Sequence, residues 1–173
     1  MDWLLFVALI VGGVGLALWL RASKIRRETA LPRGRVVYTD TGNWNRCIRP
    51  LFSDRYRLTG KPDYLVRRPE GMIPVEVKSG QAPALPHWAH VLQLAAYCLL
   101  VEDQEARRPP YGIVKYEDRA FEVDYTLALQ AELLTTLAAM RRHLYAHDVD
   151  RNHREPARCQ GCGYRERCER QLD

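Results

Sequence analysis

Two β-prone runs joined by a tight turn place the strongest constraint on how this chain folds. Residues 63–67 (DYLVR) and 72–78 (MIPVEVK) flank Arg-Pro-Glu-Gly at 68–71, a strong turn signal. The second run ends by alternating valine with charged residues, as expected for a strand that presents two different faces. The sequence therefore predicts a hairpin whose two strands lie side by side.

Three charged residues are expected to meet at the open end of this hairpin. Glu76 and Lys78 are two apart on one strand and so share a face, and the turn brings Asp63 alongside them. Two carboxylates and an ammonium suit phosphodiester hydrolysis: oxygen ligands hold Mg²⁺ or Mn²⁺, and the lysine orients water or stabilises charge. The alternative is a surface strand on which Glu76 does no more than pair with Lys78. The position of Glu76 between two valines argues against this alternative.

The rest of the chain predicts a small α/β domain with a mixed sheet. Thr126 is expected to be the N-cap of the last long helix. The other expected elements are strands at 35–39 and 56–58 with a turn at 59–62, a helix at 87–102, a hairpin of 111–116 with 120–124, and a helix from 126 to about 147.

Three segments in order, GKPDYLV (60–66), IPVEVKSG (73–80) and HVLQLAAYCLL (90–100), resemble the core of RecB-family nucleases. These belong to the PD-(D/E)XK group, which includes the four-cysteine CRISPR-associated exonucleases. The resemblance extends from about residue 58 to 168. It implies a restriction-endonuclease-like mixed sheet flanked by helices. It also implies catalytic roles for Asp63, Glu76 and Lys78, with Asp63 and Glu76 as metal ligands.

The third segment contains the Gln-x-x-x-Tyr motif of the same family, as Gln93 and Tyr97. Four residues make one helical turn, so both side chains share a face, and His90 lies one turn earlier. The resemblance implies that Gln93 and Tyr97 contact substrate or support the metal. The alternative is an ordinary helix with a half-buried tyrosine and a solvated glutamine. Many relatives also carry a His or Glu motif upstream; here the nearest acids are Asp40 and Asp54.

A cysteine triple, Cys159-x2-Cys162-x5-Cys168, lies in a turn-rich, arginine-rich tail. Such spacing predicts a metal or cluster site, and disulfides are disfavoured in a cytosolic domain. The resemblance implies that these three bind an iron–sulfur cluster, usually [4Fe–4S]. Zinc, or no metal, remains an alternative, because ligand type alone does not separate them.

The fourth cluster ligand stays open between two residues, Cys47 and His153. Cys47 is the upstream cysteine in the sequence NRCIRPLF, and His153 lies shortly before the triple. The fifth cysteine, Cys98, falls within the expected helix and is expected to be a buried helix residue.

Residues 3–20 (WLLFVALIVGGVGLALWL) are eighteen uncharged residues in a row. A helix of that length spans roughly 27 Å, close to the hydrocarbon thickness of a bilayer. A cleaved signal peptide is the alternative, but the preceding residues carry only Asp2 and no small-residue cleavage site precedes Arg21. The basic cluster that follows predicts a single-pass membrane protein with its domain on the cytoplasmic side.

The pI of about 9.1 and the net charge of +5 say little about a DNA partner. Residues 1–35 hold six basic and two acidic groups, so the remainder is near neutral. The expected organisation is a single transmembrane helix (1–20), a basic juxtamembrane linker (21–34), a nuclease core (35–150) and a cysteine-rich, cluster-binding tail (151–173).

The function predicted from these features is a membrane-tethered, Mg²⁺- or Mn²⁺-dependent DNA nuclease, an exonuclease acting on single-stranded or flapped DNA. Its partners would be DNA with free ends and, through the N-terminal helix, a membrane. Two alternatives remain. One is a catalytically weak DNA-end-binding module that keeps the nuclease fold and cluster, and the other is a membrane-bound metal or redox module unrelated to DNA.

Overall fold

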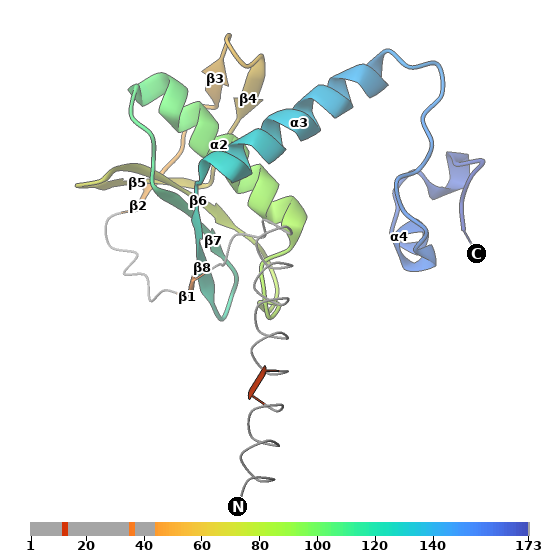
Figure 1. The fold of residues 1–173 in the computed structure, drawn as a ribbon, viewed down its shortest axis with the longest axis horizontal. Coiled ribbons are helices and arrows are strands. Elements are labelled where there is room, and N and C mark those ends of the chain that lie inside the picture. Colours follow the sequence, from red (N-terminus) through yellow and green to blue (C-terminus); the bar gives the residue numbers. More distant parts are fainter. Residues whose placement is uncertain (1–11, 14–34, 37–43, 173) are drawn as a thin grey trace, which may run out of the picture. The chain divides into compact units, whose positions relative to one another are not determined.

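The computed structural model describes residues 12–13, 35–36 and 44–172 of the chain. The chain divides after Leu133 into two compact units, each described here by itself. The first contains the β-strands and the helix α2, and the second contains the cysteine triple (Figure 1).

The first unit is built on a six-stranded mixed sheet with the strand order β1-β8-β7-β6-β5-β2. Strands β6 and β7 run parallel, and every other neighbouring pair is antiparallel. The mixed α/β fold expected from the sequence is therefore confirmed. The strands are β1 (Arg35–Val36), β2 (Trp44–Arg46), β5 (Tyr64–Arg68), β6 (Gly71–Val77), β7 (Tyr111–Lys115) and β8 (Ala120–Asp124).

Strands β5 and β6 form the hairpin expected from the turn sequence. Tyr64 pairs with Val75, and the ladder continues to Arg68 and Gly71. Gly71 has a φ of 138°, a conformation that favours glycine because it has no Cβ. Local turn chemistry and alternation thus set the pairing that brings Asp63 beside the end of β6.

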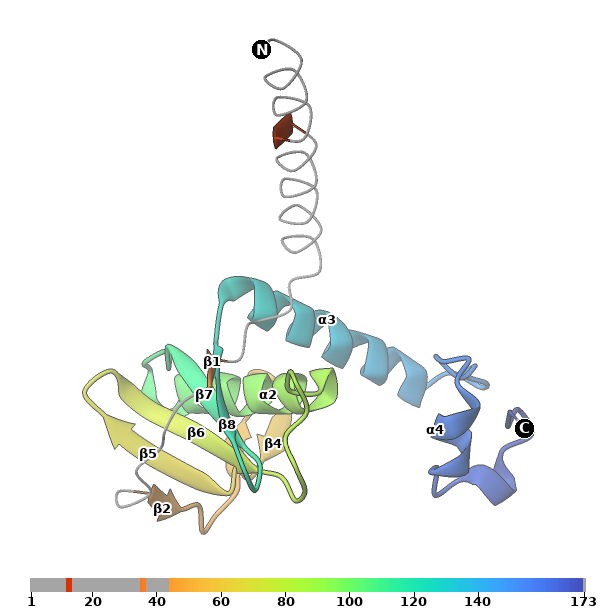
Figure 2. The ribbon, with the colours of Figure 1, turned by 90° about the horizontal axis from the view of Figure 1, so that it is seen from below.

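Helix α2 (Trp88–Glu105) lies along one face of this sheet and packs on β6 and β7 (Figure 2). Gly112 permits this close approach, since a Cβ there would stand 2.7 Å from Leu94 Cγ. Side chains alternate between the faces of a strand, so Glu76 points toward α2. The opposite face of the sheet carries a separate core cluster that includes Val75 and Ile113.

A small two-stranded sheet, β3 (Leu51–Ser53) with β4 (Leu58–Gly60), also packs against α2. The strand expected at 56–58, with its turn at 59–62, was misplaced: the turn lies at 54–57 instead. The Tyr56 amide donates to Ser53 Oγ over 3.1 Å, and Arg57 adopts a φ of 46°. A serine-capped turn therefore outweighs the β-propensity of the tyrosine.

Helix α3 (Leu127–Leu144) begins where the sequence predicts. The Leu129 amide donates to Thr126 Oγ1 over 3.1 Å, which confirms Thr126 as the N-cap. Leu129 and Leu133 are the buried residues of this helix. The second unit continues with the short helix α4 (Pro156–Gln160) and the 3₁₀ turn η2 (Arg165–Arg167), where the sequence shows no periodicity.

The described residues contain no helix that is both long and apolar enough to cross a bilayer. The long helices α2 and α3 each carry three charged side chains within eighteen residues, and such groups are costly in hydrocarbon. The predicted localisation, a single-pass membrane protein with its domain on the cytoplasmic side, is corrected by this finding. The expected transmembrane segment, 1–20, lies outside the described residues except at 12 and 13.

Candidate functional site

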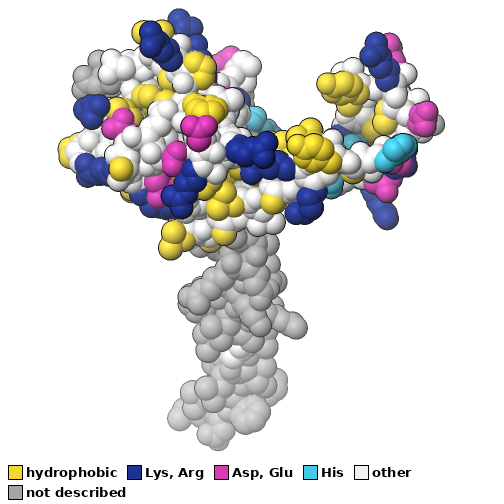
Figure 3. Space-filling view, turned by 90° about the horizontal axis from the view of Figure 1, so that it is seen from above, with side chains coloured by type: hydrophobic (Ala, Val, Ile, Leu, Met, Phe, Trp, Pro, Cys, Tyr) yellow, Lys and Arg dark blue, Asp and Glu magenta, His cyan; other side chains and the backbone are white. Residues whose placement is uncertain are grey.

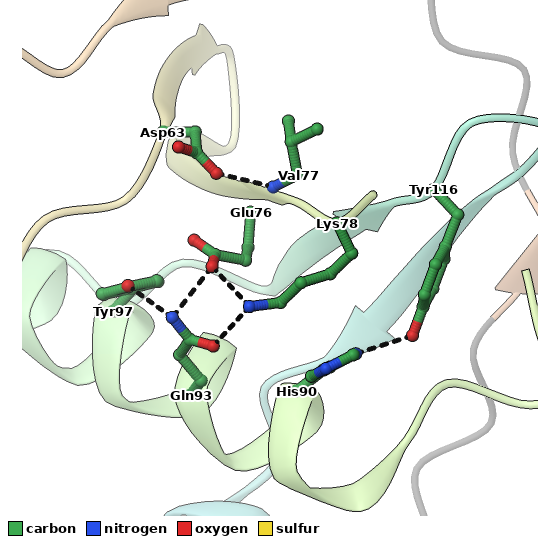
Figure 4. Close-up of polar contacts among 8 residues, drawn as sticks. All are labelled: Asp63, Glu76, Val77, Lys78, His90, Gln93, Tyr97 and Tyr116. Atoms are coloured by element: carbon green, nitrogen blue, oxygen red, sulfur yellow. Dashed lines mark hydrogen bonds and ion pairs between the residues drawn. The ribbon is translucent and has the colours of Figure 1, made fainter. Parts of the chain in front are cut away.

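Two carboxylates meet where the β5–β6 hairpin opens. Continuing the register beyond Tyr64 and Val75 places Asp63 opposite Glu76. The Val77 amide donates to Asp63 Oδ2 over 2.8 Å, which fixes the Asp63 side chain at the end of β6 (Figure 4). Asp63 is exposed, whereas Glu76 is only 6% exposed. One carboxylate therefore faces solvent while its neighbour is buried against α2.

Lys78 and Gln93 close a three-membered network with Glu76. Lys78 Nζ donates to Glu76 Oε1 and to Gln93 Oε1, each over 2.8 Å. Gln93 Nε2 donates to the same Glu76 oxygen, also over 2.8 Å. Helix α2 and strand β6 are thus linked by charge-assisted hydrogen bonds, and the pairing of Glu76 with Lys78 is part of a larger cluster.

Burial dominates the electrostatics of Glu76. It raises the pKa of the Glu76 carboxyl above its ordinary value, because the charged form loses water. The hydrogen bond and charge of Lys78 act in the opposite direction, while the negative charge of Asp63 raises the pKa further. A positive charge placed beside Glu76 would therefore stabilise the ionised form of this carboxylate.

Tyr97 joins the network from the next turn of α2. Gln93 Nε2 donates to the Tyr97 hydroxyl oxygen over 2.8 Å. Burial, and to a smaller degree the charges of Glu76 and Asp63, raise the pKa of Tyr97, so its hydroxyl stays protonated. Gly60 lies against the ring: a Cβ there would stand 2.8 Å from Tyr97 Cε1.

All five residues singled out as catalytic from the sequence thus lie together. They are Asp63, Glu76, Lys78, Gln93 and Tyr97. Of the two upstream acids, Asp54 lies in the exposed turn between β3 and β4, and Asp40 is outside the described residues.

A histidine–tyrosine pair flanks this network on the Lys78 side, as Figure 4 shows. His90 Nδ1 and the Tyr116 hydroxyl are 2.8 Å apart, and the His90 ring meets the ring of His87 edge-on at 5.3 Å. Burial lowers the pKa of His90, and the charges of Lys78 and His87 lower it further. The sequence indicated His90 through its helical spacing, but nothing local indicated Tyr116.

The loop that follows Lys78 is held by the turn between β7 and β8. The Gly80 amide donates to Glu117 Oε1 over 3.0 Å, and the Ala82 amide donates to Asp118 Oδ1 over 2.7 Å. The Lys78 amide donates to the Lys115 carbonyl over 2.7 Å, which extends the parallel pairing of β6 and β7. These three hydrogen bonds fix the backbone from which the Lys78 side chain projects.

The donor chemistry of the site fits a hard divalent cation. Two carboxylates on neighbouring strands offer the oxygen ligands that Mg²⁺ and Mn²⁺ prefer, and the raised pKa of Glu76 reflects the burial that a cation would offset. The pair alone falls short of a complete ligand set. Among the described residues, no group of three or more His, Cys, Asp or Glu is arranged to hold a metal.

The tail cysteines do not form a metal-binding group in this structure. Cys159 is buried in α4, where its sulfur accepts the Leu172 amide at 3.4 Å, while Cys162 is exposed and Cys168 is half-buried. His153, the alternative fourth ligand, also lies in the second unit, and its Nδ1 accepts the Glu155 amide at 3.3 Å.

The two remaining cysteines belong to the first unit. Cys98 is buried in α2, as expected. Cys47 is also buried, and its thiol donates to the Arg49 carbonyl over 3.1 Å. The Cys47 amide donates to the Asp63 carbonyl over 3.0 Å. Cys47, the other candidate for the fourth cluster ligand, thus neighbours the candidate catalytic site.

Comparison with known proteins identifies one family. Residues 14–169 match the family model described as the PD-(D/E)XK nuclease superfamily, and the mixed sheet with its helices fits the restriction-endonuclease-like fold. The crystal structure of SSO0001 is similar, with a TM-score of 0.51 and 20% identity over 91% of this chain and 72% of that one. At this identity the likeness concerns the fold alone. No curated protein matches the chain.

Proposed function

The chain belongs to the PD-(D/E)XK nuclease superfamily, and we propose that it is a metal-dependent DNA nuclease whose catalytic residues are Asp63, Glu76 and Lys78. One observation carries the proposal: both carboxylates lie at the open end of one hairpin, and the Lys78 ammonium is 2.8 Å from Glu76 Oε1. Members of this superfamily generally use divalent metals, and the oxygen ligands here suit Mg²⁺ or Mn²⁺.

Asp63 and Glu76 would hold the cation between them. When bound, such a cation polarises a phosphodiester and makes a water molecule a stronger nucleophile. Asp63 is oriented for this by the Val77 amide, which occupies Oδ2. Glu76 Oε1 is taken by Lys78 and Gln93, so its other oxygen remains for a ligand.

Counting donors assigns different tasks to Lys78 and Gln93. An ammonium has three N–H groups, and Lys78 uses two of them on Glu76 and Gln93. The third would donate to the phosphate or to the attacking water. The two N–H groups of Gln93 donate to Glu76 and Tyr97, and its side-chain oxygen accepts from Lys78. Gln93 therefore positions its neighbours, while the Tyr97 O–H, which hydrogen-bonds to Glu76, would help to hold that carboxylate.

We further propose that the substrate is DNA with single-stranded or flapped ends, and that the chain is a RecB-like member of the four-cysteine exonuclease type. Support comes from the order of three sequence segments, around Asp63, around Glu76 and around Gln93. In this proposal, residues 35–150 form the nuclease core and 151–173 a cofactor-binding tail.

The iron–sulfur part of this proposal rests on the spacing of Cys159, Cys162 and Cys168 and on their being free thiols. Because they are not arranged around a metal in this structure, binding a cluster would have to reorganise the tail, as metal binding coupled to folding does elsewhere. Anaerobically purified full-length chain would show visible absorption that dithionite bleaches if a cluster binds. Colourless protein containing zinc, or no metal, would contradict the cluster.

Incubating the full chain with labelled single-stranded DNA and Mn²⁺ or Mg²⁺ tests the nuclease directly. Wild type should degrade the DNA, and Asp63→Asn should not, since it removes a charged ligand without changing the size of the side chain. Asp103→Asn, which neutralises an exposed acid on α2, is the matched control and should cleave as wild type does. Equal cleavage by wild type and Asp63→Asn would overturn the catalytic assignment. Wild type that binds DNA ends without cleaving them would favour the DNA-end-binding module.

A further inference from the structure

Between residues 44 and 133, the basic residues are concentrated in one segment. Residues 44–68 contain seven arginine or lysine residues and only two acids, and all seven basic side chains are exposed. Figure 3 shows basic and exposed hydrophobic side chains side by side on the surface of the first unit. The near-neutral net charge of the chain beyond residue 35 therefore conceals a locally basic surface, and this segment includes Asp63.

Part of this surface is a groove of about 550 Å³ beside β2 and β5. Arg49 and Arg67 line it, and neither forms an ion pair within the described part of the chain. Arg46 also borders the groove, but it pairs with Tyr64, so its side chain starts from the other face of the sheet. Apolar side chains lie between the arginines: Ile48, which is 83% exposed, with Leu65 and Met72. Unpaired guanidinium groups around exposed apolar surface are suited to an anionic ligand that also has apolar faces.

The groove adjoins the catalytic carboxylates along β5. Leu65 is two residues from Asp63 on the same face of that strand and therefore lies about 7 Å away. Arg67 lies on the same face about 13 Å from Asp63. At the other wall, the Cys47 amide is bonded to the Asp63 carbonyl. A ligand chain lying in the groove would thus have one end at Asp63.

Resting on the proposed nuclease function, we infer that this groove binds the single DNA strand that enters the active site. Arg49 and Arg67 would contact phosphates, and Ile48, Leu65 and Met72 would contact the faces of unpaired bases. A duplex hides its base faces by stacking, so an apolar floor between basic walls favours a single strand. Positive charge near the site also concentrates the polyanion there.

Fluorescence anisotropy of a labelled oligothymidylate with the full chain, in EDTA, tests the inference separately from cleavage. The double variant Arg49→Ala/Arg67→Ala should bind roughly tenfold or more weakly, because two charge-assisted contacts are lost. The slope of log K against log salt should fall by about 1.4, since each phosphate contact to a single strand contributes about 0.7. Arg49→Lys/Arg67→Lys keeps both charges and should retain most of the affinity.

Arg119→Ala, which removes an exposed arginine from the turn between β7 and β8, is the control and should bind as wild type does. Unchanged affinity and salt slope in Arg49→Ala/Arg67→Ala would show that this groove does not bind the DNA strand, even if the chain cleaves DNA. The inference would also fail if the groove variant lost no more affinity than Arg119→Ala does. It would fail as well if the groove variant lost as much affinity for blunt duplex as for the single strand. If Asp63→Asn cleaves normally while the groove variants lose binding, the catalytic assignment fails and the groove stands.

Discussion

Gln93 Nε2 donates a hydrogen bond to Glu76 Oε1 over 2.8 Å and thereby joins the middle of helix α2 to the end of strand β6. The same oxygen accepts from Lys78, so one buried carboxylate is held from two elements. Neither partner is free to move without leaving a buried polar group unsatisfied, which is costly. The geometry of the site therefore depends on how closely α2 packs on the sheet.

Replacing Gln93 with alanine should lower kcat much more than it changes KM. The change removes the groups that orient Glu76, Lys78 and Tyr97, and it should lower the free energy of unfolding by about 1–3 kcal/mol. Steady-state cleavage and urea unfolding measure the two effects. Asp103→Ala, at an exposed position on the same helix, serves as the control. Wild-type kcat in Gln93→Ala would show that the bridge does not position the catalytic groups.

Lys78→Ala should slow cleavage strongly while single-stranded DNA still binds. A point charge is lost beside the scissile phosphate, but both carboxylates and the groove remain, so the rate should fall by roughly 10²–10³-fold. Single-turnover cleavage and anisotropy in EDTA give the two readouts. If binding collapses in parallel with cleavage, Lys78 is structural rather than catalytic.

Gly112→Ala should destabilise the first unit. The added Cβ would stand 2.7 Å from Leu94 Cγ, and overpacking of this kind costs about 1–3 kcal/mol. The strain should also push α2 away from β6 and separate Gln93 from Glu76, lowering kcat. Gly163→Ala meets nothing within 4 Å and should unfold at the wild-type urea concentration. Equal midpoints for the two variants would contradict the tight packing.

Stability should fall when the pH drops below the ordinary pKa of histidine, and His90 should contribute to that fall. Burial, then Lys78 and His87, lower the pKa of His90 below 6.5 in the folded chain. Below pH 6.5 the unfolded chain therefore takes up this proton before the folded chain does. The stability that neutral His90 provides is therefore complete above pH 6.5, the ordinary pKa of histidine. It is lost as the pH falls through the lowered pKa of His90 in the folded chain.

Urea unfolding across this pH range, for wild type and His90→Gln, measures the effect of His90. The variant should show a flatter dependence, because it has no imidazole to protonate beside Lys78, His87 and Tyr116. His147→Gln, at an exposed position, should keep the wild-type curve. Identical curves for wild type and His90→Gln would refute the assignment.

Cys162→Ser should lower the melting temperature before it affects catalysis, if the tail holds the proposed cluster. The cluster would act as a clamp on the tail, and losing one ligand releases it. Differential scanning calorimetry and cleavage assays, run on anaerobically purified protein, separate the two effects. A variant that melts like wild type but is inactive would contradict this order.

The sequence by itself determined the parts of the protein that depend on near neighbours in the chain. The hairpin of β5 and β6 follows from a tight turn and from alternation, so Asp63 and Glu76 could be paired without a structure. Gln93 and Tyr97 share a face because four residues make one helical turn. Thr126 could be identified as an N-cap for the same local reason.

Only the tertiary structure decided how these parts meet. The parallel pairing of β6 with β7, the contact between His90 and Tyr116, and the approach of Leu94 to Gly112 join residues from separate elements. The groove lined by Arg49 and Arg67 likewise combines strand β5 with the segment that follows β2, and the net charge of the chain does not indicate it. Local patterns state which face of an element is apolar but not which partner covers it, because partner choice is set by packing across the whole core.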